Sequence, residues 1–395
     1  MGMNLETLRI AFVLGSQFPT SRAYGITTRE TLEVLLNHSI EFKVFCLKSS
    51  YSDTDFDRVK KHIFHMKIVY LSKILRFFSN YGNSKLNYLI WRLALLIDLY
   101  FNLPKIKEYA PNVVWTRDPF IAYLVLKNLP EVRVILEVHE SVGKIFFKKL
   151  IKFQYIKFFP INKENNLFLL QLFGANKNHE IMPMGVRNDR VPSLKTIEQY
   201  AKSFRNSNKT VSTISYVGAF EPSGYSKGID DLMNLAIYLQ NQLLPYKVQL
   251  VGASKTEFLK YSSIKSDLKL SDRYLEVLPH VSHSEALLIM KKSDILILPA
   301  YKSKRYMGMP IKLLEYLISG KITFIGDCEL YRSFLPPYLY PLMYPSSDPA
   351  MMFNYIQSFL DNRNLCEFLE LSVKFSSEFT WENRTMAILN SITSS

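Results

Sequence analysis

Short apolar runs alternate with longer amphipathic segments through the first half of the chain. Four apolar runs of strand length occupy residues 9–14, 42–47, 113–116 and 132–138. The first is followed by a polar loop, 15–25, and then by the segment 26–37, in which leucines recur at helical spacing. This alternation of strands and helices predicts a parallel sheet with helices on both faces.

The same alternation begins again after a polar segment in the middle of the chain. A helix at 165–172 and a short strand at 180–183 close the first half. The second series has strands at 211–217, 247–251, 275–277, 295–298 and 322–325, and helices at 229–242, 284–292 and 310–319. Residues 191–209 are polar and indicate a linker. Two such series predict an α/β protein of two doubly wound, Rossmann-like domains.

The composition is that of a folded protein, with 48% hydrophobic and 21% charged residues among 395. A formal net charge of +14 favours anionic partners (phosphates, nucleic acids or acidic lipids) without choosing among them. Three widely spaced cysteines predict no disulfide framework and no metal site, and they indicate a reduced, intracellular protein. The start of the chain lacks a signal-peptide pattern. The most apolar stretch, 86–103, contains Arg92 and Asp98, which favours a buried or amphipathic helix over a membrane span.

The strongest local signal is the segment 308–321, GMPIKLLEYLISGK. Proline suits the first turn of a helix and glycine the position just past its end, so a helix is predicted over 310–319. A helix that begins after a parallel strand places its amides where anions bind in doubly wound folds, which makes Gly308 a candidate. Glu315 then lies within reach of a hydroxyl pair. The alternative is that Lys312 and Glu315 form only a solvated pair on one helix face.

Two further candidate sites follow predicted strands. Gly218 ends one strand and Lys227 precedes the next helix, a pattern in which backbone approaches a diphosphate and an ammonium neutralises it, although a tight turn would look the same. His139 and Arg117 follow two strands of the first half, where they are either ligand contacts or structural hydrogen-bonding groups. The histidines form no cluster, so no metal is predicted.

The segment 144–159, KIFFKKLIKFQYIKFF, has the pattern of an amphipathic helix. Four lysines share one face, namely Lys144, Lys148, Lys149 and Lys152. Such a helix binds an anionic membrane surface, or it packs its apolar side on its own domain.

Several of these pieces, in this order, resemble group 1 (family 4-like) glycosyltransferases of the GT-B fold. The matching pieces are YVGAF with KGIDDL, LEVLPHVSHSEALLIMKKSDILILPA, GMPIKLLEYLISGK and FTWENRTMAIL, together with WTRD and EVHE in the first half. The resemblance implies two domains that face each other across a cleft: an acceptor-side domain at 1–190 and a nucleotide-sugar donor domain at 210–372. It also implies a C-terminal helix, within 373–395, that crosses back to the first domain.

The resemblance also implies roles for individual residues. Glu315 would bind the donor ribose and Lys227 its diphosphate, beside Gly218, Gly308 and Lys312. Gly25, Arg117 and His139 would line the acceptor side, with His139 near the transferred sugar. Family members often carry a second glutamate eight positions before Glu315, where Met307 stands here. Ala219 and Phe220 likewise stand where a basic residue is usual, and Lys304, Arg305 or Lys312 are candidates to supply that charge.

These observations predict an enzyme, a glycosyltransferase of the hexosyltransferase type. The resemblance implies that it would move a sugar from a nucleotide-sugar to a hydroxyl of a glycan or lipid-linked acceptor, with retention of configuration and without a metal or other cofactor. We expect a role in polysaccharide or glycoconjugate synthesis, in the cytoplasm or on the inner face of the plasma membrane. One alternative is a catalytically inactive protein of the same fold that binds a nucleotide-sugar or a membrane. A nucleic-acid-binding protein is disfavoured because no recognition module is visible.

Overall fold

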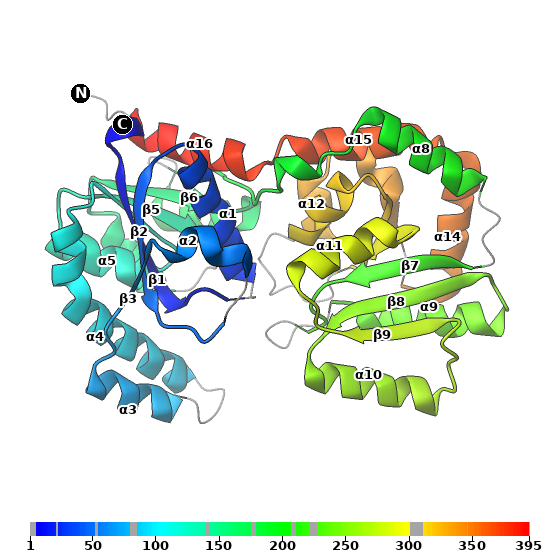
Figure 1. Ribbon diagram of the computed structural model, residues 1–395, viewed down its shortest axis with the longest axis horizontal. Coiled ribbons are helices and arrows are strands. Elements are labelled where there is room, and N and C mark those ends of the chain that lie inside the picture. Colours follow the sequence, from blue (N-terminus) through cyan, green and yellow to red (C-terminus); the bar gives the residue numbers. More distant parts are fainter. Residues whose placement is uncertain are drawn as a thin grey trace. The chain divides into compact units, whose positions relative to one another are not determined.

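The computed structural model describes residues 5–20, 23–51, 54–79, 85–139, 143–174, 179–206, 211–221, 227–300, 311–345 and 347–394 (Figure 1). The chain forms two compact units. The first comprises Met1–Met184 and Trp381–Ser395, and the second comprises most of the chain between them.

The first unit is built on a six-stranded parallel sheet in the order β3-β2-β1-β4-β5-β6. Its strands are β1 (Arg9–Gln17), β2 (Glu41–Leu47), β3 (Ile63–His65), β4 (Val113–Thr116), β5 (Arg133–Val138) and β6 (Ile156–Pro160). This is the doubly wound order, in which the chain turns back between β1 and β4. The carboxyl ends of those two strands are therefore the expected place for a ligand.

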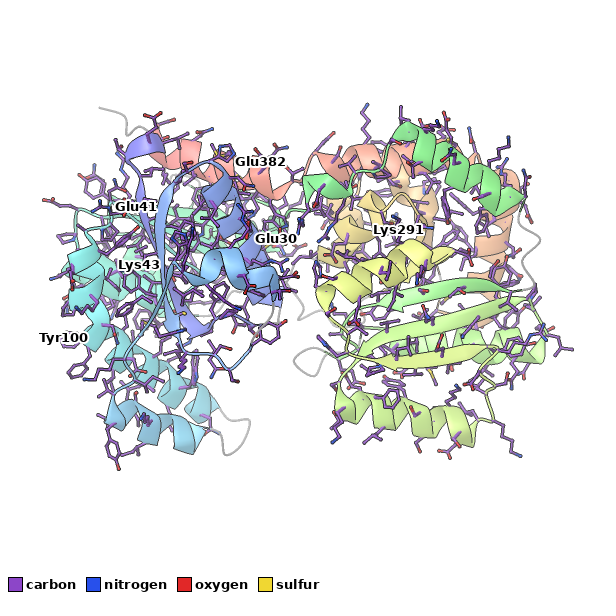
Figure 2. The ribbon with its side chains drawn as sticks, viewed as in Figure 1. Glu30, Glu41, Lys43, Tyr100, Lys291 and Glu382 are labelled. Atoms are coloured by element: carbon purple, nitrogen blue, oxygen red, sulfur yellow. The ribbon has the colours of Figure 1, made fainter. Side chains whose placement is uncertain are left out.

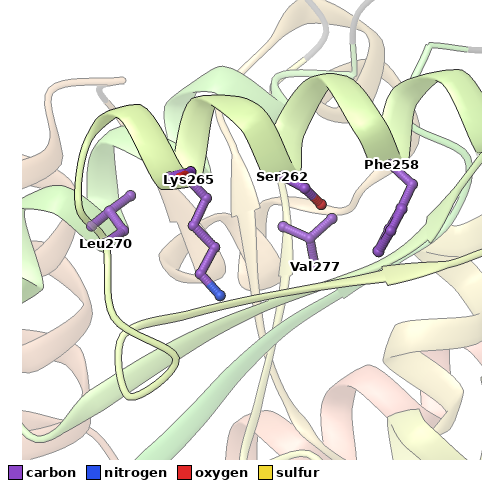
Figure 3. Close-up of a pocket in the computed structure, with 6 residues that line it drawn as sticks. Phe258, Ser262, Lys265, Leu270 and Val277 are labelled. Carbon is purple, nitrogen blue, oxygen red and sulfur yellow. The ribbon is translucent and has the colours of Figure 1, made fainter.

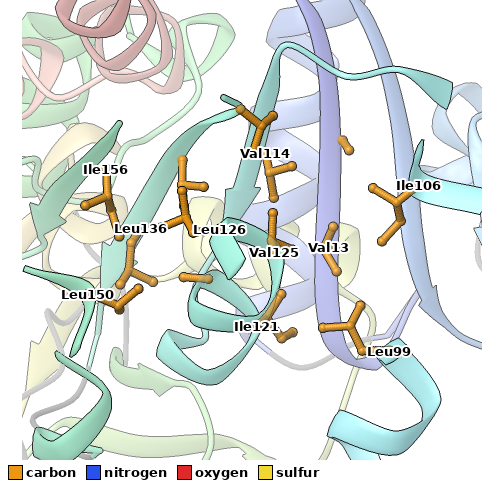
Figure 4. Packing of buried hydrophobic residues seen from close by; sticks show 14 of the residues in the cluster. Val13, Leu99, Ile106, Val114, Ile121, Val125, Leu126, Leu136, Leu150 and Ile156 are labelled. Carbon is orange, nitrogen blue, oxygen red and sulfur yellow. The ribbon is translucent and has the colours of Figure 1, made fainter. Parts of the chain in front are cut away.

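Helices cover both faces of this sheet. They are α1 (Ala23–Asn37), α2 (Asp57–Lys60), α3 (Tyr70–Ser79), α4 (Lys85–Tyr109), α5 (Pro119–Asn128), α6 (Lys144–Leu150), α7 (Lys163–Phe173) and α16 (Trp381–Thr393). On one face, α4 to α7 pack on the sheet, and Val13, Val114 and Leu136 lie in that core (Figure 4). On the other face, α1 and α16 contribute to a second core around Phe12 and Trp115. The C-terminal helix is thus part of the first unit.

Helix α3 packs on α4 (Figure 1). A buried polar residue in the apolar stretch 86–103 of α4 forms hydrogen bonds to the start of α3. Asp98 is fully buried, and its Oδ1 accepts hydrogen bonds from the Val69 amide at 2.8 Å and the Ser72 hydroxyl at 2.5 Å. Arg92 pairs with Asp118, which caps α5. Both charges therefore serve packing within the unit. Within the described part of the chain, no helix has both the length and the apolar character to cross a membrane.

Three expectations for the first half need correction. Strand β1 continues to Gln17, and Gly25 lies in the first turn of α1 rather than at the end of a loop. The single helix expected over 144–159 is only α6, because residues 156–160 instead pair with β5 and bury Ile156, Phe158 and Phe159. Residues 180–183 form no strand, although Glu180 and Met182 donate hydrogen bonds to the backbone of β6.

The second unit repeats the plan with a six-stranded parallel sheet in the order β12-β11-β10-β7-β8-β9. Its strands are β7 (Ser212–Val217), β8 (Tyr246–Ala253), β9 (Leu275–Pro279), β10 (Ile295–Leu298), β11 (Ile322–Gly326) and β12 (Met343–Tyr344). Its helices are α8 (Leu194–Arg205), α9 (Ile229–Asn241), α10 (Lys255–Asp267), α11 (His283–Lys292), α12 (Ile311–Ile318), α13 (Glu329–Phe334), α14 (Pro349–Asn362) and α15 (Leu365–Ser377). Here the chain turns back between β7 and β10, so the prediction of two doubly wound, Rossmann-like domains is confirmed.

The segment expected to be a linker, 191–209, contains helix α8 and belongs to the second unit. The Ser193 hydroxyl accepts a hydrogen bond from the Thr196 amide and caps the helix. Ile197 and Ala201, four residues apart, are buried on a face that packs on α15. Ile197 and Ala201 lie on the buried face of an otherwise polar helix, and the polar composition of the segment concealed that face.

Candidate functional site

The candidate donor site lies in the second unit, beside the carboxyl ends of β7 and β10. Gly218 follows β7 directly, and Lys227 and Gly228 lead into α9. Gly228 has a φ of +75°, and a Cβ on it would lie 2.6 Å from Cβ of Pro299, just after β10. Only glycine allows the start of α9 to approach the end of β10 this closely without strain. The turn therefore holds Lys227 next to the point where the chain order reverses.

Glu315 lies at the centre of this site, on α12. Its residue is 6% exposed, and its Oε2 is 2.8 Å from Nζ of Lys312. Its Oε1 accepts a hydrogen bond of 3.4 Å from Arg190 and lies 3.9 Å from Nε2 of His283. Arg190 also contacts the His283 ring nitrogen at 2.9 Å. The pair of Lys312 and Glu315 is therefore part of a buried cluster rather than a solvated pair on one face.

The charge of Glu315 is maintained by its neighbours. Burial by itself raises the pKa of this carboxyl, but Lys312, His283 and Arg190 outweigh that effect and lower it to about 2. The group is thus ionised at neutral pH and can accept hydrogen bonds from two adjacent hydroxyls.

Lys227 lies within electrostatic reach of the same cluster. Burial lowers its pKa, and the like charge of Lys312 lowers it further, to about 8. Lys312 thus pairs with Glu315 and also acts electrostatically on Lys227, so the three predicted residues belong to one neighbourhood. The ammonium groups of Lys227 and Lys312 repel each other, and an anion bound beside them would reduce that repulsion.

A tyrosine fixes α12 against the sheet. The Tyr316 hydroxyl accepts a hydrogen bond of 2.6 Å from the Val217 amide and donates one of 3.1 Å to the Val217 carbonyl. Because Val217 is the last residue of β7, this contact sets the rotation of the helix beside Gly218. The neighbouring Glu315 is thereby turned toward the site.

Not every predicted residue can be placed, and two further residues were not predicted. Gly308 lies outside the described residues, as does Met307. Arg190 stands next to the segment predicted as a linker, and His283 begins α11 after a loop. Neither carries a pattern in the sequence that would have singled it out, because both reach Glu315 only through the fold.

The first unit has a second cluster of charged groups, at the ends of β4 and β5. Glu137 is 1% exposed, and its Oε1 accepts a hydrogen bond of 2.6 Å from the Trp115 indole. Its Oε2 accepts hydrogen bonds of 2.8 Å from His139 and 3.0 Å from Arg384, and lies 3.3 Å from Nε of Arg117. Glu137 and Arg384 were each quoted only as part of a motif, EVHE and FTWENRTMAIL, and neither was singled out as a site residue.

Arg117 contacts the first turn of α1, which contains Gly25. Arg117 donates hydrogen bonds to the Thr27 hydroxyl at 2.8 Å and to the Tyr24 carbonyl at 3.2 Å. It therefore pairs with Glu137 and α1 rather than with Asp118. A Cβ on Gly25 would lie 2.4 Å from the Thr20 carbonyl oxygen, so the preceding loop packs against this turn because glycine stands there.

Other surface features lie apart from these clusters. The four predicted lysines, Lys144, Lys148, Lys149 and Lys152, are exposed, the last of them beyond the end of α6. A depression of about 410 Å³ between α10 and β9 is lined by residues such as Phe258, Lys265 and Val277, none of which belongs to either cluster (Figure 3). Among the described side chains, no group of three or more His, Cys, Asp or Glu is arranged to hold a metal ion.

The two six-stranded parallel sheets give this protein the GT-B fold of two Rossmann-like domains. The structure superposes on the N-terminal domain of Candida albicans trehalose-6-phosphate phosphatase with a TM-score of 0.70 at 13% identity, covering 100% of this chain and 97% of that one. Anabaena HepE in complex with UDP-glucose superposes with a TM-score of 0.67 at 9% identity, covering 98% of this chain and 100% of that one. Sucrose-phosphate synthase from Thermosynechococcus elongatus superposes with a TM-score of 0.68 at 14% identity, covering 97% of this chain and 98% of that one. At these identities the likeness shows the fold.

The family match lies in the second unit. Residues 198–372 match the model of the family described as glycosyl transferases group 1, so this unit carries a group 1 glycosyltransferase domain. The resemblance inferred from the sequence is thereby confirmed at the level of the group. No curated protein matches the chain by sequence.

Proposed function

We propose that this protein is a glycosyltransferase that binds a nucleotide-sugar on its second unit and transfers the sugar to an acceptor hydroxyl. The observation that carries the proposal is the buried, ionised Glu315 paired with Lys312, whose charge also acts on Lys227, in the group 1 domain. A carboxylate suits the ribose hydroxyls, and the ammonium groups suit the diphosphate. HepE, which shares the fold, was crystallised with UDP-glucose.

The reaction follows from the charges. As the bond between the anomeric carbon and the diphosphate breaks, negative charge accumulates on the diphosphate, and Lys227 and Lys312 stabilise it. The acceptor oxygen forms the new bond to the anomeric carbon, on the face that the diphosphate leaves. Its proton passes to the departing phosphate oxygen. We therefore propose retention of configuration, with no metal needed for the leaving group because the two lysines supply the positive charge.

The proposed acceptor is a glycan or a lipid-linked glycan, and the first unit would contribute His139 to hydroxyl recognition. The His139 side chain is 25% exposed, so part of its ring is open to a ligand. Arg117 is more enclosed and acts chiefly by holding α1 and Glu137.

A thermal-unfolding screen against UDP-, GDP- and ADP-sugars tests donor binding. One class of nucleotide-sugar is expected to stabilise the protein by about 2.7 kcal/mol when present at about one hundred times its dissociation constant. The matching nucleoside monophosphate serves as a control, since it lacks the diphosphate that Lys227 and Lys312 would hold. No stabilisation by any of these donors would contradict the proposal.

Turnover separates this proposal from an inactive protein of the same fold. Nucleotide release from the stabilising donor, in the presence of lipid-linked or oligosaccharide acceptors, is the result expected of a transferase. Donor binding without any release favours the inactive alternative. Binding of nucleic acid that weakens steeply with salt would favour a nucleic-acid-binding protein, the alternative that the +14 charge suggests.

We further propose that the first unit docks on an anionic membrane surface, as a lipid-linked acceptor requires. Helices α3, α4 and α6 carry nine basic and two acidic residues. Large apolar side chains are exposed on the first two of these helices, namely Tyr70, Leu71, Ile74, Leu93, Tyr100 and Phe101. Tyr100 stands out at the edge of the unit in Figure 2. Helix α5 packs on both α4 and α6, so the three elements lie on the same side of the sheet. Exposed aromatic and aliphatic groups beside lysines suit the boundary of an acidic bilayer.

Co-sedimentation with vesicles tests this surface. The protein is expected to bind phosphatidylcholine vesicles that contain phosphatidylserine and to bind pure phosphatidylcholine much more weakly. The double variant Lys148→Glu/Lys149→Glu should reduce binding at least about tenfold, because each lysine near the surface contributes about 1 kcal/mol. Lys291→Glu, on the second unit, is the matched control. Equal binding of the double variant and the control would contradict this docking surface.

A further inference from the structure

A buried carboxylate in the first unit has partners on both of its oxygens, and the two oxygens differ in what they hold. Oε1 of Glu137 faces the Trp115 indole, which lies within the core. Oε2 faces His139, Arg384 and Arg117. One oxygen therefore anchors the side chain, and the other meets His139, whose side chain is the most exposed of the group.

The charges of the cluster determine where the histidine proton is. Burial by itself raises the pKa of Glu137, but Arg384 and Arg117 outweigh it and hold the pKa well below its usual range. An ionised carboxylate only accepts hydrogen bonds, so Nε2 of His139 must donate. Burial lowers the pKa of His139, Arg117 lowers it further, and the opposing effect of Glu137 leaves it at about 4. At neutral pH the ring thus carries one proton, on Nε2, and Nδ1 is an acceptor.

We propose that Glu137 is a positioning residue that fixes His139 as the Nε2–H tautomer, so that Nδ1 accepts a hydrogen bond from a substrate hydroxyl. This inference rests on the proposed function, since it assigns the ligand of His139 as a hydroxyl group of a sugar. A hydroxyl suits the site because it can donate a hydrogen bond to a neutral ring nitrogen, whereas the two guanidinium groups would repel a cationic ligand.

The C-terminal helix completes this arrangement. Arg384, on α16, is 247 residues from Glu137 in sequence, and its Nε also donates to the Pro183 carbonyl at 2.9 Å. Its guanidinium is buried and adds the second positive charge to the cluster. Protonating His139 would add a third, so Arg384 and Arg117 together keep the ring neutral while Glu137 keeps it oriented.

Nitrogen NMR of the intact protein, labelled on histidine, reads the tautomer directly. The His139 signals are assigned by their absence from His139→Gln. We expect the Nε2–H tautomer at pH 7 and protonation only near pH 4. An Nδ1–H tautomer, or an imidazolium at pH 7, would overturn the inference.

Two matched variants then separate positioning from packing. The Glu137→Gln side chain has one oxygen in place of two, so it cannot accept hydrogen bonds from both Trp115 and His139. We therefore expect this variant to lose the single tautomer and to lower kcat by about 10- to 100-fold, with little change in KM for the donor. Trp115→Phe removes the hydrogen bond to Oε1 alone, so it should lower stability and leave the tautomer as it is. A folded Glu137→Gln with the original tautomer and an unchanged kcat contradicts the proposal.

A third variant decides the question if Glu137→Gln does not fold. Arg384→Met keeps the apolar stem and removes one positive charge, so the pKa of His139 should rise from about 4. An unchanged pKa would overturn the inference. A protein that transfers no sugar but shows these NMR results would refute the proposed function and leave the role of Glu137 standing.

Discussion

Glu315→Gln is expected to weaken binding of the nucleotide-sugar donor by about 10- to 100-fold. The carboxylate is buried beside Lys312 and Arg190, and its charge-assisted hydrogen bonds to ribose hydroxyls contribute about 1.5–3 kcal/mol. The amide keeps the shape of the side chain but has one oxygen in place of two. Titration calorimetry with the donor identified in the thermal screen measures the change.

The same substitution should also lower the free energy of unfolding. With a folded-state pKa of about 2 against a usual value of 4.5, the ionised Glu315 contributes stability that is present above pH 4.5 and is lost as the pH falls toward 2. A shift of this size corresponds to about 3 kcal/mol. Removing the carboxylate leaves Lys312 and Arg190 partly buried without their partner, which is costly in the same direction.

A surface pair of the same length provides the control for Glu315. Glu276, on β9, lies 2.8 Å from Nζ of Lys247, as Glu315 does from Lys312, but its side chain is 35% exposed. Glu276→Gln should change stability by less than about 1 kcal/mol and leave donor binding unchanged. If Glu315→Gln bound the donor as tightly as Glu276→Gln, the assignment of the ribose site would be wrong.

Lys227→Gln is expected to lower kcat by about 10²- to 10³-fold, because it removes a fixed charge from the departing diphosphate. The loss should be smaller for Lys227→Arg, which keeps the charge but changes the geometry. Steady-state kinetics with the identified donor and acceptor measure both variants.

The wild-type pH profile follows from the pKa of Lys227. Burial and the nearby Lys312 lower that pKa to about 8, so the ammonium is present below pH 8 and is lost above it. The ratio kcat/KM reports the free enzyme and should therefore fall as the pH rises through 8. In Lys227→Arg this alkaline limb should disappear, since the guanidinium stays charged.

Lys265→Gln is the matched control for Lys227. Lys265 is on α10 in the same unit, pairs with Asp272, and lines the depression shown in Figure 3. Its substitution should leave kcat and the pH profile unchanged. An effect equal to that of Lys227→Gln would move the candidate site to that depression.

The two Rossmann-like domains could be predicted because the alternation of apolar runs and amphipathic segments is a local property. Strand ends followed by Gly218 and Lys227, and a helix carrying Lys312 and Glu315, were recognisable for the same reason. The failures came where local patterns conflict with long-range pairing. Residues 156–160 read as the continuation of a basic amphipathic helix, but hydrogen bonding to β5 makes them a strand.

The sequence by itself determined the fold class and the position of the group 1 domain, and it singled out Lys227, Lys312 and Glu315 as candidates, since each depends on a short segment and on parallel strands that end at one edge. Only the tertiary structure decided that Arg190 and His283 meet Glu315, and that Arg384 of the last helix meets Glu137. These contacts join residues far apart in sequence, and a charge becomes important to a site only when folding buries it beside its partner.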